Sequence, residues 1–219
     1  MSMTLIIGNK NYSSWSFRGW LAMKLSGVPF VEHLVPLGHT TVPGAPSNPE
    51  LLDHSAAGKV PVLKDGELLV WDSLAIFEYL AERAPGADLW PGDRVARARA
   101  RSISAEMHAG FMALRGEAPM NMRRAVKPLL LSDSAAYDVT RIAAIWREAL
   151  ASSGGPFLFG AFSLADAMYA PVVNRFHVYA LSDDPVVRAY MDRMMAEPLW
   201  QEWETAARAE EWVIAAEEV

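Results

Sequence analysis

Residues 11–18 read Asn-Tyr-Ser-Ser-Trp-Ser-Phe-Arg, and they connect the short apolar run Leu5-Ile6-Ile7 to a segment with helical spacing. A strand that leads through hydroxyl residues into a helix creates an anion site, because the first-turn N–H groups are unsatisfied and the helix dipole is positive there. Serine hydroxyls at this point can donate hydrogen bonds to a thiolate or an oxyanion. The chain contains no cysteine, so a thiolate held here must belong to a small molecule. The segment therefore indicates an enzyme with a thiol cofactor.

Composition supports a globular protein and argues against several other classes. The chain has 219 residues, of which 52% are hydrophobic and 21% are charged, so a substantial core is expected. A net charge of −6 disfavours nucleic-acid binding. The sequence predicts no membrane span and no signal peptide, which indicates a cytoplasmic protein. The lack of cysteine excludes disulfides, thiolate metal sites and a protein thiol nucleophile.

The first part of the chain alternates strand-like and helical segments. Strands are expected at residues 5–8, 30–35, 60–63 and 68–70, and helices at 14–26 and 73–83. Asp65-Gly66 predicts a hairpin turn between the last two strands. Residues 36–49 contain four prolines and two glycines, which indicates a long loop. These elements predict a small α/β domain at residues 1–84.

Strand signals stop after this domain, and the remaining pattern is helical. Prolines and glycines at residues 85–93 predict a linker. Helices are then expected at about residues 94–115, 134–152, 163–181, 185–195 and 199–208. The sequence thus predicts an α/β domain followed by an all-helical domain at residues 94–219.

These features together resemble the soluble glutathione S-transferase superfamily over essentially the whole chain. Residues 13–18 look like the serine motif of the zeta class, in which a cysteine stands at the position of Trp15. The resemblance implies a thioredoxin-like N-terminal domain packed on a helical C-terminal domain, usually in a homodimer. It also implies that glutathione is the thiol cofactor.

Two short motifs resemble the glutathione site of the family. In the family, the proline corresponding to Pro61 is cis, and the residue before it, here Val60, pairs its backbone with the cysteinyl part of glutathione. Local sequence alone favours an ordinary trans proline at the start of a strand. Ser73 and the neighbouring amides suit the γ-glutamyl carboxylate, and Asp72 suits its ammonium, although the family often has Glu or Gln there. The resemblance also assigns Trp15, Lys59 and, in the long loop, His39 to glutathione binding.

A third motif, Ser163-Leu164-Ala165-Asp166, resembles the helix start that members of the family carry in the C-terminal domain. Its spacing predicts a capping box in which Asp takes the place of Glu. We expect this motif to support folding and not catalysis.

The serine segment itself is expected to carry the catalytic groups. Ser13 aligns with the catalytic serine of the family, and Ser14 is the neighbour most able to replace it. A hydroxyl donor at a helix N-terminus lowers the pKa of a bound thiol. Tyr12 is an alternative, because other classes of the family use tyrosine. Arg18 adds positive charge one turn into the helix.

The resemblance places the second substrate beside the first long helix of the helical domain. Helical spacing puts Met107, His108, Phe111, Met112 and Arg115 on one side of that helix. Met and Phe at this spacing are more often plain core, which is the structural alternative for them. Arg115, Arg123, Arg124 and Arg175 are candidates for holding a substrate carboxylate, with an ion pair to an acidic residue such as Glu106 as the structural alternative for Arg175. The histidines at 33, 39, 54, 108 and 177 show no metal-ligand spacing, so no metal site is expected.

The sequence favours a glutathione-dependent transferase that acts on a small electrophile. Two alternatives remain open at this point. One is a glutathione-dependent cis–trans isomerase similar to maleylacetoacetate isomerase, for which arginines would bind a dicarboxylate. The other is a non-catalytic protein that uses the same scaffold to bind a ligand or a partner.

Overall fold

The computed structural model describes residues 2–38 and 47–219. Its N-terminal half contains a four-stranded sheet in the order β2-β1-β3-β4. The strands are β1 (Met3–Ile7), β2 (Phe30–Leu34), β3 (Val62–Asp65) and β4 (Leu68–Trp71). β1 is parallel to β2 and antiparallel to β3, and β3 and β4 form the expected hairpin.

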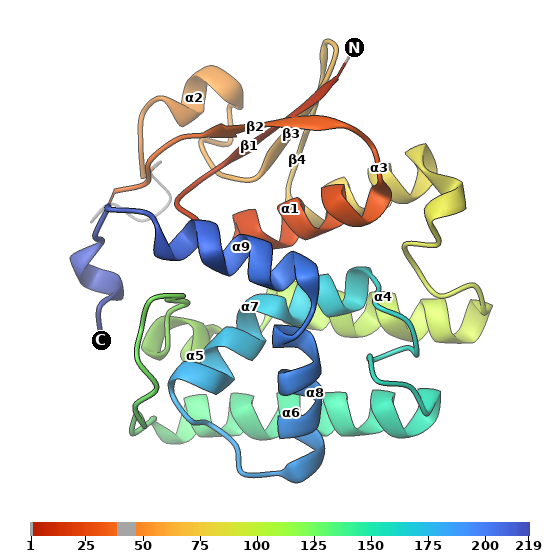
Figure 1. Ribbon diagram of the computed structural model, residues 1–219, viewed down its shortest axis with the longest axis vertical. Coiled ribbons are helices and arrows are strands. Elements are labelled where there is room, and N and C mark those ends of the chain that lie inside the picture. Colours follow the sequence, from red (N-terminus) through yellow and green to blue (C-terminus); the bar gives the residue numbers. More distant parts are fainter. Residues whose placement is uncertain (1, 39–46) are drawn as a thin grey trace.

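Helices cover both faces of this sheet (Figure 1). α1 (Ser14–Ser26) and α3 (Ser73–Arg83) lie on the face that meets the helical half, and the short α2 (Leu51–His54) lies on the other face. The β-α-β start followed by a β-hairpin and a helix is the predicted thioredoxin-like arrangement, which is confirmed. The sequence did not predict α2, because its four residues are too short to show a helical period.

The C-terminal half is helical, as predicted. Its elements are α4 (Arg94–Ala109), α5 (Met112–Glu117), α6 (Asp133–Ser153), α7 (Leu164–Val178), α8 (Pro185–Met195) and α9 (Pro198–Arg208), with short 3₁₀ turns at Pro85–Ala87 and Ala215–Glu217. Every residue of α7 except His177 is buried, so this helix forms the centre of the domain. It packs against both α1 and α4.

One apolar core runs through both halves. Buried residues of the sheet, such as Leu5 and Leu63, belong to the same cluster as Trp146 on α6 and Trp203 on α9. The division into domains at residues 84 and 94 remains a prediction, because the core does not separate there. No helix of the described part of the chain is long and apolar enough to cross a membrane.

The structure corrects the helix predicted at residues 94–115. α4 ends at Ala109, and Phe111 takes a left-handed conformation with φ of 58°. A Cβ on Gly110 would lie only 2.9 Å from the carbonyl oxygen of Glu106, so glycine permits this close turn. The break rotates the residues after it relative to those before it, which alters the faces predicted from one continuous helix.

The predicted capping box at the start of α7 is confirmed. Ser163 Oγ accepts from the N–H of Ala165 at 3.3 Å, and Asp166 accepts from the N–H of Ser163 at 3.0 Å. Asp166 is fully buried and also accepts from the N–H of Leu158 and the hydroxyl of Tyr190. Burial raises the pKa of Asp166 to about 6, against the opposing effect of these hydrogen bonds.

Candidate active site

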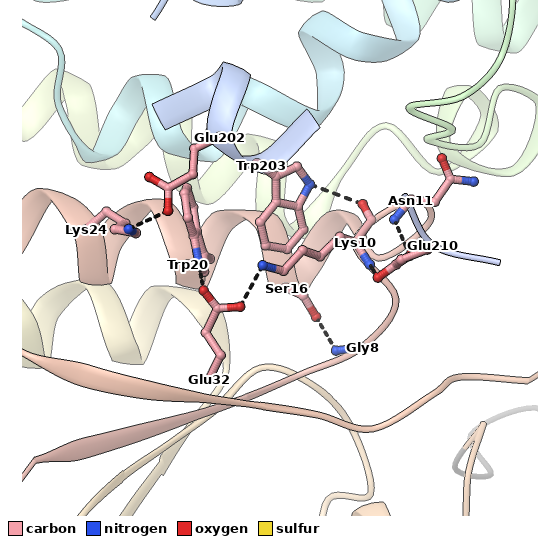
Figure 2. Close-up of polar contacts among 10 residues, drawn as sticks. All are labelled: Gly8, Lys10, Asn11, Ser16, Trp20, Lys24, Glu32, Glu202, Trp203 and Glu210. Carbon is pink, nitrogen blue, oxygen red and sulfur yellow. Dashed lines mark hydrogen bonds and ion pairs between the residues drawn. The ribbon is translucent and has the colours of Figure 1, made fainter. Parts of the chain in front are cut away.

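Hydrogen bonds to α1 and to the C-terminal part of the chain hold the loop between β1 and α1. The N–H of Gly8 donates to Ser16 Oγ at 2.8 Å, and the backbone N–H groups of Lys10 and Asn11 donate to the carboxylate of Glu210 at 2.6 and 3.0 Å (Figure 2). Trp203 on α9 donates its indole N–H to the Lys10 carbonyl at 3.1 Å. The segment after α9 therefore fixes the loop that carries the serines, a contact that no local sequence pattern indicates.

The two candidate serines differ in their hydrogen bonds. Ser13 is the N-cap of α1: its hydroxyl accepts from the N–H of Ser16 at 3.3 Å and donates to Ser16 Oγ at 2.7 Å. Ser14 is the first helical residue, and its hydroxyl has no hydrogen-bond partner among the described residues. Both side chains are at least nine-tenths buried and line a cavity. The hydroxyl that is free to meet a ligand is thus that of Ser14.

Tyr12 lines the same cavity with its ring, but its hydroxyl is already engaged. It contacts the carboxylate of Glu218 and accepts from Arg123 Nη2 at 2.9 Å. Arg123 also donates to the carbonyls of Glu210 and Trp212. These contacts tie Tyr12 to the C-terminal segment and favour a serine over this tyrosine as the hydroxyl donor.

Two adjoining cavities lie between the sheet and the helical half. The first, of about 440 Å³, contains the serines and is called the serine cavity; it also takes in Leu37, Ser47, Leu51, Gly58, Met112, Gly116, Arg175 and Glu217. The second, of about 280 Å³, is called the proline cavity and includes Ala57, Pro61, Trp71, Asp72, Ser73 and His108. Trp15, Lys59, Val60 and Arg115 line both. The two cavities can therefore hold different parts of one ligand.

The Val60–Pro61 peptide bond is cis, as the resemblance implied. Pro61 packs against α1 at Gly19, where a Cβ would lie 2.9 Å from Pro61 Cγ. This close approach sets the distance between α1 and the chain before β3. Val60 consequently lies where it lines both cavities beside the N-terminus of α1.

The start of α3 forms one end of the proline cavity. Asp72 caps the helix by accepting from the N–H of Leu74 at 2.9 Å, and its second carboxylate oxygen lies 2.8 Å from His108 Nε2. Ser73 is 2% exposed, and its hydroxyl has no partner within the described residues. A buried hydroxyl without a partner is uncommon in folded proteins, so it marks a position that a ligand can satisfy.

Three arginines converge near Trp15. The guanidinium of Arg18 lies 4.4 Å from the Trp15 ring centroid and that of Arg115 lies 4.8 Å from it. Arg18 is buried and donates to the carbonyls of Met168 and Ser14, at 2.7 and 3.3 Å. Arg175 is buried and donates to the Ala118 carbonyl at 2.8 Å. Within the described residues, neither Arg18 nor Arg115 forms an ion pair with a carboxylate.

Burial and mutual repulsion act together on these arginines. Burial lowers the pKa of Arg18 well below its usual value, and the charges of Arg175 and Arg115 lower it further. Burial and the charge of Arg115 lower the pKa of Arg175 to about 10, while Glu217 opposes the shift. Burial likewise lowers the pKa of Arg115. The site therefore concentrates positive charge in a poorly solvated region, where an anion would relieve the repulsion.

The structure corrects several expectations about the second-substrate site. Met107 and Phe111 are buried in the core and line neither cavity, since Met107 lies on the buried face of α4 with Ala100 and Ser104 and Phe111 follows the turn at Gly110. His108 faces Asp72 in the proline cavity instead of a separate substrate pocket. Arg175 does not pair with Glu106, whose carboxylate binds Arg141 at 2.7 and 2.9 Å.

The remaining candidate residues lie at different places relative to the two cavities. Arg123 and Arg124 lie outside both cavities, the first bound to the C-terminal segment and the second 4.5 Å from the ring centroid of Tyr179. Met112 and Arg115 line the serine cavity. His39 lies outside the described residues. Glu217, Leu51 and Trp71 line the cavities without having been predicted, since their place depends on how distant segments fold together.

Comparison with known proteins gives two family matches. Residues 12–83 match the model "Glutathione S-transferase, N-terminal domain", and residues 125–193 match "Glutathione S-transferase, C-terminal domain". The chain is 38% identical over 81 residues to a zeta-class glutathione S-transferase of Euphorbia esula, covering 37% of this chain and 34% of that protein. It is 32% identical over 114 residues to the maleylacetoacetate isomerase of Pseudomonas aeruginosa, covering 51% of this chain and 52% of the relative.

Solved structures share the fold over nearly the whole chain. A glutathione transferase homolog from Burkholderia, crystallised with bound glutathione, is 24% identical and superposes with a TM-score of 0.72, covering 96% of this chain and all of that one. A theta-class enzyme from Xanthomonas axonopodis pv. citri with glutathione bound is 22% identical, with a TM-score of 0.66, and covers 92% of this chain and 96% of its own.

Proposed function

Because this chain belongs to the glutathione S-transferase superfamily, we propose that it binds glutathione and activates the thiol for attack on a small electrophile. One observation carries this proposal: the Ser14 hydroxyl lacks a partner among the described residues while it lines a cavity at the first turn of α1. The chain has no cysteine of its own, so the nucleophilic sulfur would be that of glutathione.

The site has the means to favour a thiolate over a thiol. The N-terminus of α1 supplies a positive dipole end and unsatisfied N–H groups. Ser14 can donate a hydrogen bond to the sulfur, and Arg18, Arg115 and Arg175 add positive potential. Each of these effects stabilises the anion relative to the neutral thiol, and so each lowers the thiol pKa. We assign the hydrogen bond to Ser14 and the helix cap to Ser13.

The proline cavity suits the peptide part of glutathione. The buried Ser73 hydroxyl and the first-turn amides of α3 are donors for the γ-glutamyl carboxylate. Asp72 is an acceptor for the ammonium group, with His108 beside it. Val60 lies between the two cavities, where its backbone can pair with the cysteinyl part. Bound glutathione in the Burkholderia and Xanthomonas structures supports the assignment of this ligand.

The charge of the serine cavity favours an electrophile with a carboxylate. Arg115 and Arg175 both line it, and the lowered pKa values of both arginines reflect a region in which positive charge is poorly solvated. An anionic substrate would lower the energy of both guanidiniums. A neutral apolar electrophile would place an apolar surface against two poorly solvated guanidiniums.

This observation also supports cis–trans isomerisation as the second candidate function. The thiolate would add to a conjugated carbon–carbon double bond, rotation would follow about the resulting single bond, and elimination would restore the double bond and the thiolate. The partial similarity to maleylacetoacetate isomerases is consistent with that reaction. A transferase instead retains the new carbon–sulfur bond, so analysis of the product distinguishes the two.

The test of glutathione activation is an ultraviolet difference titration of the bound thiolate against pH, with S-methylglutathione as the control that has no thiol. We expect the thiol pKa to fall below its free value and to rise again in Ser14→Ala. Saturable binding without a change in thiol pKa would support a non-catalytic glutathione-binding protein. Absence of binding would contradict the proposal altogether.

We also propose that the protein is a homodimer, as the family generally is. Light scattering coupled to size-exclusion chromatography measures this directly. A monomer at micromolar concentration would contradict the assignment, without affecting the proposal for the active site.

A further inference from the structure

We propose that His33, Glu50 and His54 form a binding site for a divalent transition-metal ion, with Zn²⁺ the best match, on the face of the sheet opposite α1. Each residue offers one ligand atom, and these atoms lie within 4.8 Å of one another. The site is separate from both cavities described above. It does not depend on glutathione binding.

The fold brings these residues together from two elements. Glu32, the neighbour of His33 in β2, binds Lys10 and Trp20 on the α1 side of the sheet (Figure 2). Because successive side chains of a strand point to opposite faces, His33 lies on the other face, where α2 lies (Figure 1). Glu50 is the N-cap residue of α2 and His54 is its last residue. The three residues therefore face one another between β2 and α2.

The spacing is already close to that of a metal site. His33 Nε2 lies 3.6 Å from Glu50 Oε1, and the rings of His33 and His54 have centroids 4.7 Å apart. Tetrahedral Zn²⁺ with bonds of about 2.0–2.1 Å places its ligands about 3.3 Å apart. Small side-chain rotations would thus be enough to close the set around one ion. His33 and Glu50 are nearly half exposed, at 45% and 49%, so an ion can reach them.

The donor set selects the class of metal. Two imidazoles and one carboxylate are the ligands of many zinc sites, and they leave a fourth position for water. Imidazole favours Zn²⁺, Ni²⁺ and Cu²⁺ over Mg²⁺ and Ca²⁺, which prefer oxygen ligands throughout. Mg²⁺ is therefore a suitable negative control.

The backbone beneath the site is anchored. Leu51, between Glu50 and His54, is 1% exposed and packs with Ile6 and Val62 of the sheet and with Val35 directly after β2. This packing holds α2 against the sheet before any ion is bound, which reduces the ordering cost of metal binding. Since Leu51 also lines the serine cavity, a bound ion would hold one wall of that cavity to the edge strand β2.

The experiment is calorimetric titration of the untagged protein with Zn²⁺ in the absence of glutathione. We expect one saturable event. Mutation of a residue that only supports a metal ligand weakens metal binding about 10- to 100-fold. Because His33→Gln and His54→Gln each remove a ligand itself, each should weaken Zn²⁺ binding about 100-fold or more. His177→Gln is the matched control and should bind as the unchanged protein does. Co²⁺ should give visible absorption bands that the first two variants lack.

A second measurement covers the case in which a variant folds poorly. Substoichiometric paramagnetic Co²⁺ added to the unchanged protein should broaden the imidazole NMR signals of His33 and His54 and spare those of His108 and His177. Uniform broadening of all histidines would overturn the proposal. So would the absence of saturable Zn²⁺ binding, or equal affinity in His33→Gln and His177→Gln.

Discussion

The helices α1 and α7 both start from a serine N-cap, yet the two starts serve different ends. At α7, Ser163 and Asp166 satisfy each other and the neighbouring N–H groups, and both side chains are buried. At α1, Ser13 makes the cap while the next hydroxyl, that of Ser14, is unpaired within the described residues and lines a cavity. A closed helix start contributes stability, whereas an open one keeps a donor available for a ligand.

The start of α3 belongs to the open type. Asp72 caps the helix as Ser13 caps α1, and Ser73 follows with a buried, unpartnered hydroxyl as Ser14 follows Ser13. Both open starts line the joined cavities, from opposite sides of Val60. The comparison predicts that changes at the start of α7 alter stability alone, and that removal of the unpaired hydroxyls of Ser14 and Ser73 alters ligand chemistry with little effect on stability.

The largest effect on stability is expected at the closed start. Asp166→Ala leaves the buried N–H groups of Leu158 and Ser163 and the Tyr190 hydroxyl without their acceptor. Since each unsatisfied buried donor costs roughly 1–3 kcal/mol and the loss of a buried charge offsets part of this, we expect a net loss of about 3 kcal/mol. Denaturant unfolding measures it. Glutathione affinity should not change at a temperature where the variant is folded.

The Asp166 carboxyl should also make the free energy of unfolding of the protein depend on pH. The folded pKa of Asp166 is about 6, above its ordinary value of 3.8, so the folded state binds more protons between these values. The stability that protonation of Asp166 adds to the folded state is therefore fully present below about pH 4, and it is lost as the pH rises through 6.

Asp166→Asn is the matched variant, because it cannot ionise. Relative to this variant, the unchanged protein should lose about 2 to 3 kcal/mol between pH 4 and pH 7. Urea unfolding at several pH values gives the difference curve and removes the contribution of all other carboxylates. A flat difference would show that Asp166 titrates alike in the folded and unfolded states.

The open start at α1 should respond in catalysis. Removal of one hydrogen-bond donor to a developing or stable anion costs on the order of 100-fold in rate, so we expect a loss of that size in kcat/KM for Ser14→Ala with a model electrophile. Glutathione affinity should change little, because the hydroxyl acts on the sulfur alone.

Ser13→Ala sharpens this assignment. It removes the cap of α1, which is worth about 1 kcal/mol of stability, and should reduce activity less than Ser14→Ala does. If Ser13→Ala proves the more damaging to catalysis, the capping hydroxyl would have to turn toward the sulfur when glutathione binds, and the roles assigned to the two serines would be reversed.

Much of this architecture could be predicted from local sequence. The period of the apolar residues placed α1, α3 and α6–α9 to within a few residues, and the capping box at Ser163 followed from its motif. The cis bond before Pro61 followed only from the resemblance to the family, since local sequence favours a trans proline there. The superfamily and the thioredoxin-like N-terminal fold were predicted correctly, because the motifs that carry the resemblance are properties of adjacent residues.

The errors came from places where one local conformation changes the phase of a helix. A single left-handed residue, Phe111, follows the early end of α4, and its side chain enters the core and not the expected substrate wall. Met107 is absent from that wall for another reason, because it lies on the buried face of α4 with Ala100 and Ser104. Glu106, named as an acidic partner for Arg175, binds Arg141 instead, while Arg175 donates to the carbonyls of Ala118 and Pro171 and is influenced by the charge of Glu217. The cluster of His33 with Glu50 and His54 depends on chain segments 17 residues apart. The Glu–His spacing of four residues was the one local sign of it.

The hydroxyl at the start of α3 gives the smallest expected effect and the cleanest test of the comparison. Ser73→Ala removes a donor that has no partner among the described residues, so the free energy of unfolding should stay within about 0.5 kcal/mol. If the γ-glutamyl carboxylate accepts from this hydroxyl, glutathione affinity should fall about tenfold, the usual effect of one hydrogen bond to a charged group. Calorimetric titration with glutathione measures the affinity of the unchanged protein and of the variant.

Ser104→Ala is the matched control for this experiment. The Ser104 hydroxyl is likewise buried and unpaired within the described residues, but it lies on α4 and lines neither cavity. Both variants remove the same atom from a buried position, so any general effect of the change on packing should be shared. A loss of affinity confined to Ser73→Ala would connect the open helix start to the ligand, whereas equal affinities would make Ser73 a buried hydroxyl of the same kind as Ser104.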